Sequence, residues 1–132
     1  MLGITPTACR TRLLRGKGYL KEILKKYWGF SSFRKPQEAI ITTVLNNQDC
    51  IALLPTGGGK SICFQVPAIA KEGVCLVISP LVALMQDQVN QLKEKGIKAE
   101  TIPSKSSEDE IITLFDNIKF GKVKFLYISP ER

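Results

Sequence analysis

Apolar residues along this chain occur either in short continuous runs or at helical spacing. Three runs, 50–54, 74–78 and 125–128, are flanked by glycine, proline or polar residues, a pattern typical of buried strands in a parallel sheet. Residues 98–102 form a weaker strand candidate. Between the runs, apolar side chains recur at intervals of three or four residues, which predicts helices.

Three helices are expected before the second run. The first spans 19–27. The second begins at Pro36, because proline suits the first turn of a helix, and ends near Asn46 and Asn47. The third runs from residue 60 to about residue 70.

Two further helices follow the second run. Pro80 introduces one that Gly96 closes. Ser106 or Ser107 can cap the other, since its first turn, 108–110, is entirely acidic and suits the positive end of the helix dipole. The apolar positions expected on one face of the first of these helices are Leu81, Leu84, Met85, Val89 and Leu92.

Strands that alternate with helices predict an α/β fold, with a parallel sheet flanked by helices and preceded by an N-terminal helical segment. Four strands would make a small sheet for this architecture. The length of 132 residues allows one domain at most, with a core that needs no disulfide or metal.

The net charge of +7 is concentrated at the start of the chain. Residues 1–21 carry five basic and no acidic side chains, whereas 22–132 carry 14 basic and 12 acidic ones. We expect 1–20 to be a basic, poorly ordered extension. A nucleic-acid-binding arm, a targeting peptide and a tail without a role all remain open for it.

Composition excludes several classes of site. With no histidine, the chain contains no histidine-based triad and no zinc site of mixed cysteine and histidine ligands. Cys50, Cys63 and Cys75 lie in apolar surroundings without a paired spacing, so we expect them to be small residues of the core.

No apolar run approaches membrane-spanning length, which favours a soluble, intracellular protein without a membrane partner.

The chemistry is concentrated in a glycine loop between the first expected strand and the helix that begins at Lys60. Such a loop directs backbone N–H groups to one point beside the helix N-terminus, and that point binds phosphate. Lys60 can reach the β and γ phosphates of a nucleotide, and the Ser61 hydroxyl can ligate Mg²⁺. The expected phosphate-binding residues are Thr56, Gly57, Gly58, Gly59, Lys60 and Ser61.

The loop alone leaves alternatives open. Leu54 stands where the strict phosphate-loop pattern has glycine. A dinucleotide site of the Rossmann type is a weaker competitor, because its fingerprint does not require Lys60 and Ser61. A kinase or transport ATPase with a phosphate loop, and a non-catalytic nucleic-acid-binding module, also remain possible.

Four segments in order resemble RecQ-type DNA helicases, a branch of the superfamily-2 helicases. Residues 55–61 look like motif I, and Leu126 to Arg132 match a later family segment. Residues 77–89 are similar to the motif Ia of this family, whereas DEAD-box RNA helicases share the style of the loop but not this motif Ia. The residues that resemble motif 0 are Leu24, Trp28, Gly29, Phe33, Arg34, Gln37, Ile40 and Ile41.

The resemblance implies roles for three motif 0 residues. Phe30 and Arg34 would sandwich adenine, and Gln37 would read its edge through two hydrogen bonds. An aromatic ring, a guanidinium plane and an amide all suit these tasks. Without the resemblance, core packing would be expected for Phe30 and a solvated helix position for Gln37.

The resemblance also places Ser79, Pro80 and Leu81 at the carboxyl end of a strand, against the backbone of single-stranded DNA. Residues 21–132 would then be the first part of the N-terminal RecA-like domain of an ATP-dependent 3′ to 5′ DNA helicase of recombination and repair. We expect a monomer that uses ATP and Mg²⁺.

Helicases of this kind also need an Asp-Glu-x-His segment for ATP hydrolysis, and a chain without histidine cannot contain it. We therefore expect a helicase portion that ends before the hydrolytic acids. By itself it should neither hydrolyse ATP nor unwind DNA.

Overall fold

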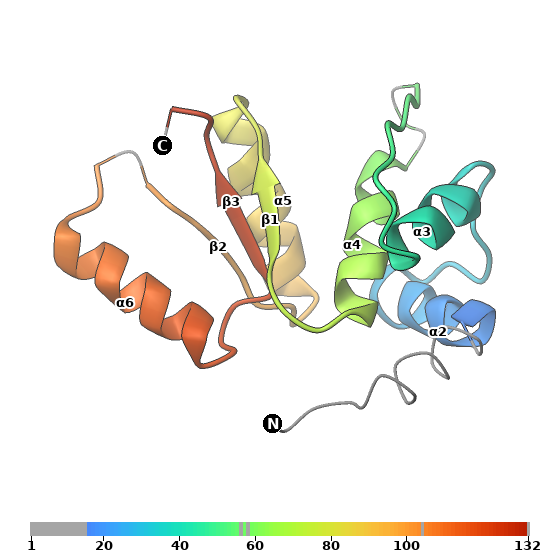
Figure 1. The fold of residues 1–132 in the computed structure, drawn as a ribbon, viewed down its shortest axis with the longest axis horizontal. Coiled ribbons are helices and arrows are strands. Elements are labelled where there is room, and N and C mark those ends of the chain that lie inside the picture. The colour runs from blue at the N-terminus through green and yellow to red at the C-terminus, as the bar shows by residue number, and fades with distance from the viewer. Residues whose placement is uncertain (1–15, 56, 58, 104, 132) are drawn as a thin grey trace. The chain divides into compact units, whose positions relative to one another are not determined.

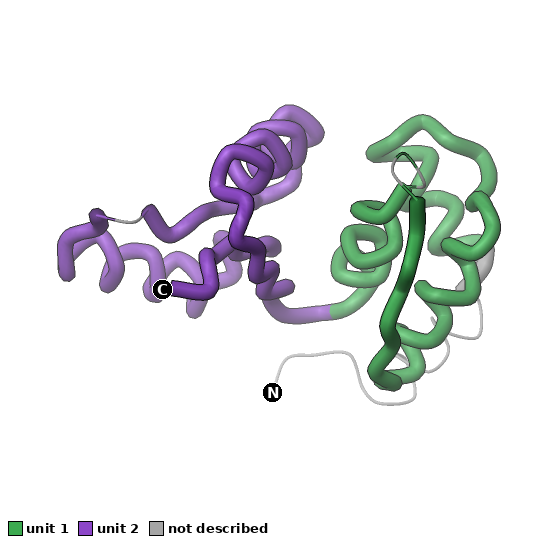
Figure 2. Tube along the Cα trace, turned by 90° about the horizontal axis from the view of Figure 1, so that it is seen from above, with its two compact units in different colours: residues 1–71 green, residues 72–132 purple. Residues whose placement is uncertain are grey.

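The computed structural model describes residues 16–55, 57, 59–103 and 105–131 (Figure 1). The chain divides into two compact units, Met1–Lys71 and Glu72–Arg132, which Figure 2 colours separately. The first is helical where described, and the second contains a parallel sheet. Of the basic, poorly ordered extension expected at 1–20, residues 1–15 lie outside the described residues, whereas 16–20 are helical.

The first unit is built on three helices, α2 (Gly16–Trp28), α3 (Gln37–Leu45) and α4 (Lys60–Ala70). Both α2 and α3 pack against α4. Their contact faces form one apolar cluster, because side chains three and four residues apart lie on the same side of a helix. The buried residues of this cluster are Leu20, Ile23, Leu24, Ile41, Leu45, Ile62 and Val66.

The helix predictions for this unit hold, with shifted ends. α2 begins at Gly16, before the expected start at residue 19. Pro36 is the N-cap of α3, and the chain leaves that helix through Asn46 and Asn47, whose φ of 59° is left-handed. Asparagine tolerates this conformation better than most residues do.

The second unit alternates strands and helices. Its elements are β1 (Cys75–Ile78), α5 (Val82–Glu94), β2 (Ala99–Thr101), α6 (Glu108–Lys119) and β3 (Phe125–Ile128). The strands are parallel in the order β1-β3-β2, with Cys75 and Ala99 both level with Phe125. The predicted α/β class is confirmed, as a partial RecA-like fold with a helical segment before the sheet.

α5 packs against β2 through an apolar face that is narrower than expected. Met85, Val89 and Leu92 are buried, but Leu81 and Leu84 are exposed. The prediction that all five share the buried face is wrong for these two: Leu81 precedes the first helical residue, and Leu84 lies off the contacting stripe.

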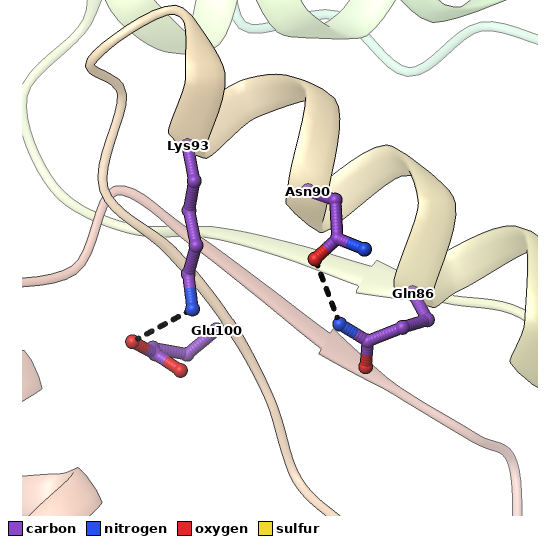
Figure 3. A network of polar contacts seen from close by, with 4 residues as sticks. All are labelled: Gln86, Asn90, Lys93 and Glu100. Atoms are coloured by element: carbon purple, nitrogen blue, oxygen red, sulfur yellow. Dashed lines mark hydrogen bonds and ion pairs between the residues drawn. The ribbon is translucent and has the colours of Figure 1, made fainter.

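Side chains on the exposed side of α5 form two polar pairs (Figure 3). Lys93 pairs with Glu100 of β2 at 3.6 Å, and Gln86 donates to Asn90 one turn along the helix. Because the Lys93–Glu100 pair is half-exposed, solvent screening keeps its contribution below about 1 kcal/mol.

α6 begins with the expected cap. Ser107 accepts a hydrogen bond from the Glu110 N–H, and the Glu110 carboxylate accepts one from the Ser107 N–H. This reciprocal capping box satisfies two N–H groups that the helix leaves unpaired. No residue of α6 is buried. Local capping therefore contributes much of what fixes this helix.

The predicted strand at 50–54 is wrong. These residues form no strand, and Ile51 and Leu53 are 92% and 90% exposed. A strand needs a hydrogen-bonding neighbour, but β1, β2 and β3 pair with one another, and no described residue pairs with 50–54. The sheet consequently has three strands among the described residues. Cys50, expected in the core, is exposed for the same reason.

Across the described parts of the chain, every helix falls short of the length and apolar character that spanning a bilayer requires.

The contrast between Ile41, which is fully buried, and Ile51 gives a direct test of this fold. Ile41→Ala should lower the free energy of unfolding by about 3 kcal/mol, because it leaves a cavity in the helical core. Ile51→Ala should change it by less than about 0.5 kcal/mol. Urea denaturation followed by circular dichroism measures both. Equal losses would contradict the exposed position of 50–54.

Candidate functional site

The glycine loop leads directly into α4. Gly57 and Gly59 have φ angles of 80° and 74°, a left-handed conformation that glycine adopts without the strain a Cβ introduces. Gly59 is the N-cap of α4, and Lys60 is its first residue. The predicted loop residues Thr56 and Gly58 lie outside the described residues.

The start of α4 suits an anion. Its first turn contains no acidic residue, and no described side chain caps it. α6 differs in both respects, since it has a capping box and three acids in its first turn. Backbone N–H groups at a helix start carry partial positive charge, and at α4 no carboxylate or hydroxyl cap competes with a ligand for them.

Gln37 joins the start of α3 to this loop. Its side chain is only 3% exposed, so the solvated position that sequence reasoning favours is wrong. The Arg34 N–H donates to Gln37 Oε1 at 2.8 Å, and Gln37 Nε2 donates to the Gly59 carbonyl at 3.2 Å. A buried amide needs partners at both ends, and this one has them.

Arg34 makes a second link to the same loop. Its Nη1 donates to the Gly57 carbonyl at 3.1 Å. The side chains of Arg34 and Gln37 therefore contact the carbonyls of the two left-handed glycines. Arg34 and Gln37 are thus held against the glycine loop, although more than 20 positions separate them from it in sequence.

The packing at Gly59 is tight. A Cβ built there would collide with Gln37 Nε2, whereas one built at Gly57 would meet nothing within 4 Å. A larger residue at Gly59 would therefore have an unfavourable backbone angle and would also force the Gln37 amide to move.

Cys63 contacts the loop from inside α4. Its thiol donates to the Gly59 carbonyl at 3.7 Å, and burial raises the pKa of Cys63. The side chain therefore remains a neutral thiol near pH 7, and it packs as the small core residue that was expected.

A cavity of about 530 Å³ lies between the loop and the residues before α3. Phe30 is half-exposed and lines this cavity, so the core position favoured by the bare sequence is wrong for it. The residues that line the cavity are Phe30, Ser31, Ser32, Arg34, Gln37, Gly57, Gly59 and Ile62. All three residues expected around adenine are therefore brought together beside the loop.

Lys60 and Ser61 are not among the residues lining this cavity. They occupy the first two positions of α4, immediately after Gly59, with Lys60 exposed and Ser61 partly buried.

Ser79, Pro80 and Leu81 lie in the second unit, directly after β1. The Ser79 N–H donates to the Ile128 carbonyl at 3.1 Å, which extends the β1–β3 pairing by one residue. The Ser79 hydroxyl accepts from the Leu81 N–H at 3.2 Å, while Pro80 and Leu81 are exposed. The predicted location at the carboxyl end of a strand is confirmed.

One motif Ia residue has a structural role that sequence reasoning missed. The Tyr127 hydroxyl, on a side chain that is almost fully buried, donates to Gln88 Oε1 at 2.9 Å. A buried phenol needs an acceptor, and the tyrosine within an otherwise apolar strand was the available signal.

The Gly59–Gln37 contact can be tested by paired substitutions. Gly57→Ala and Gly59→Ala impose the same left-handed strain, about 1–2 kcal/mol each. Gly59→Ala should destabilise the chain further, because only its Cβ meets Gln37. In a Gln37→Ala background this excess should disappear, as measured by urea denaturation. An excess that persists without Gln37 would refute the contact.

Known proteins with similar sequences indicate the family of this chain. The chain is 46% identical over 112 residues to the ATP-dependent DNA helicase RecQ of Synechocystis sp. and 45% identical over 113 residues to that of Bacillus subtilis. The RecQ helicase of Haemophilus influenzae is 44% identical over 110 residues.

These alignments cover 85%, 85% and 83% of the chain but only 23%, 19% and 18% of the respective relatives. The chain thus spans about a fifth of the length of the curated relatives that it matches. Residues 34–132 match the family model of the DEAD/DEAH box helicases. That match includes the glycine loop, α4 and the whole second unit, so the chain belongs to the DEAD/DEAH box helicase family and is similar within it to the RecQ helicases.

Proposed function

We propose that residues 21–132 form the first part of the N-terminal RecA-like domain of a RecQ-type, ATP-dependent DNA helicase. One observation carries the nucleotide-binding part of this proposal. Arg34 and Gln37 hold the carbonyls of Gly57 and Gly59 while lining the same cavity as Phe30. A base site and a phosphate loop are therefore built as one unit.

The hydrogen-bonding capacity of the two motif 0 side chains is compatible with adenine. Gln37 uses one N–H and one lone pair within the protein, which leaves one of each for the edge of a base. Arg34 donates to Gly57 from its edge, so its guanidinium face can stack on adenine opposite Phe30. Neither residue has to give up its contact with the loop.

The phosphates of ATP would bind at the start of α4. Backbone N–H groups of the loop residues Gly57 and Gly59 would face them, and Lys60 would contact the β and γ phosphates. The Ser61 hydroxyl is a hard oxygen ligand suited to Mg²⁺. The metal, when bound, neutralises phosphate charge.

The exposed segment of Ser79, Pro80 and Leu81 would contact the backbone of single-stranded DNA. Its place at the carboxyl end of a parallel strand, where open α/β sheets bind ligands, supports this role. We further propose that the whole helicase moves along DNA in the 3′ to 5′ direction and functions in recombination and repair. We expect it to be a monomer with an intracellular, nucleoid-associated location. The 132-residue chain alone should bind nucleotide without hydrolysing it or unwinding DNA.

Mg-ATP binding by the 132-residue chain tests this proposal. Lys60→Ala should weaken binding by about 10- to 100-fold, because it removes a charge-assisted contact to phosphate. Isothermal titration calorimetry of Mg-ATP into the parent chain and the variant measures the change. Lys105→Ala, which removes an exposed lysine in the second unit, is the matched control and should bind as the parent does. Parental affinity in Lys60→Ala would exclude the phosphate-loop assignment.

A further inference from the structure

Four lysines and one exposed phenylalanine lie at, or just before, the amino ends of β2 and β3. We call this group the amino-edge surface. Its members are Lys98, Lys119, Phe120, Lys122 and Lys124. It lies at the opposite end of the strands from Ser79, Pro80 and Leu81, which follow the carboxyl end of β1. In Figure 1, the amino ends of the strands lie at the lower side of the sheet, and the link from the end of α6 rises to the start of β3 there.

Backbone hydrogen bonds fix the positions of these residues. The N–H groups of Lys124 and Phe125 both donate to the Lys98 carbonyl, at 2.7 and 3.1 Å. The Lys122 N–H donates to the Asn117 carbonyl at 2.8 Å, which folds the link back against the end of α6. Only four residues, 121–124, separate the C-cap Phe120 from β3, so Lys122 and Lys124 follow the ring closely along the chain.

The link from α6 to β3 alternates between core and surface. Val123 and Phe125 are buried, whereas Lys122 is exposed. Lys124 is partly buried, and its Nζ donates to the Gly73 carbonyl at 2.9 Å. This alternation keeps the positive side chains on the outer face while the apolar ones anchor the link.

Phe120 is 70% exposed, and Lys119 Nζ lies 5.9 Å from the centroid of its ring. A single exposed phenylalanine is unremarkable on a protein surface. This ring, however, has the Lys119 ammonium near it and three more lysines at the adjoining strand ends, and so combines an aromatic face with positive charge. These two elements are the ones that bind single-stranded nucleic acid, through base stacking and phosphate contacts.

The acidic residues nearby leave the surface positive. Glu72 acts electrostatically on Lys124, and Glu94 and Asp116 occupy the last turns of α5 and α6. The three acids of the α6 first turn lie at the other end of that helix, about 13 Å or more from Lys119 by the helix rise of about 1.5 Å per residue. The four lysines therefore outnumber the adjacent carboxylates.

We propose that the amino-edge surface binds single-stranded DNA, with a base stacked on Phe120 and phosphates on Lys98, Lys119 and Lys122. This inference rests on the proposed function for the identity of the nucleic acid. It adds a second DNA contact, at the end of the sheet opposite the motif Ia segment. A DNA strand that contacts both places is bound by a larger protein surface than the motif Ia segment alone.

Fluorescence anisotropy with a labelled oligothymidylate and the full 132-residue chain tests the stacking contact. Phe120→Leu keeps the apolar area but removes the aromatic face, and should weaken binding about tenfold. Phe120→Trp should restore it. Phe115→Leu is the matched control, since Phe115 is also exposed on α6, and it should bind as the parent does. Equal affinities of the two leucine variants would overturn the proposal, as would failure of the parent chain to bind.

The phosphate contacts have their own readout. Each contact removed from a single strand lowers the slope of log affinity against log salt by about 0.7, so the double substitution Lys119→Gln and Lys122→Gln should lower it by about 1.4. The same double change at Lys21 and Lys25, which are exposed on α2, is the charge-matched control and should leave the slope unchanged. Equal reductions of the salt slope by both pairs would mean that DNA is attracted by net charge alone, and would refute the proposed DNA-binding surface.

Mg-ATP titration of the same variants separates this proposal from the proposed function. Phe120→Leu should bind nucleotide as the parent does, because the nucleotide cavity is lined entirely by residues of the first unit. If Lys60→Ala kept its affinity for nucleotide while Phe120→Leu lost affinity for DNA, the nucleotide assignment would fail and the amino-edge surface would stand.

Discussion

The buried amide of Gln37 is the interaction on which the candidate site depends. It joins the turn before α3 to the N-cap of α4 by accepting from Arg34 and donating to Gly59. Because the amide is nearly inaccessible to water, losing either partner would leave a buried polar group unpaired, which costs about 1–3 kcal/mol. Gln37 therefore fixes the loop carbonyl at the same place where it borders the cavity.

This arrangement gives the glycine loop a physical constraint beyond flexibility. Gly59 must be left-handed to begin α4, and it must lack a Cβ to admit Gln37. Gly57 shares the first requirement but not the second. The same short motif thus contains one glycine that is constrained by its backbone angle alone and another that is constrained by packing as well. The sequence of the motif does not reveal this difference.

Much of the fold follows from local pattern. The helix α4 and the Ser107 cap depend on residues close in sequence, and they appear where periodicity and capping rules place them. The error at 50–54 is of a different kind. An apolar run predicts a strand only if neighbours exist to pair with it, and pairing is a property of the whole sheet.

The site shows the same division. The proposal of a phosphate loop rests on Lys60 and Ser61 in the sequence, but the burial of Gln37 and the exposure of Phe30 contradict what their residue types suggest. Only the family resemblance indicated that these two side chains would meet beside the loop. The Gln88–Tyr127 bond escaped prediction because it joins positions 39 residues apart.

The central claim is that Gln37 and the glycine loop together form the nucleotide site. Nuclear magnetic resonance of the ¹⁵N-labelled chain during titration with a non-hydrolysable Mg-ATP analogue tests it most directly. The account predicts that the Gln37 side-chain amide and the backbone amides of Gly57, Gly59 and Lys60 shift together, with one common dissociation constant. Shifts confined to other residues, with these signals unmoved, would contradict it.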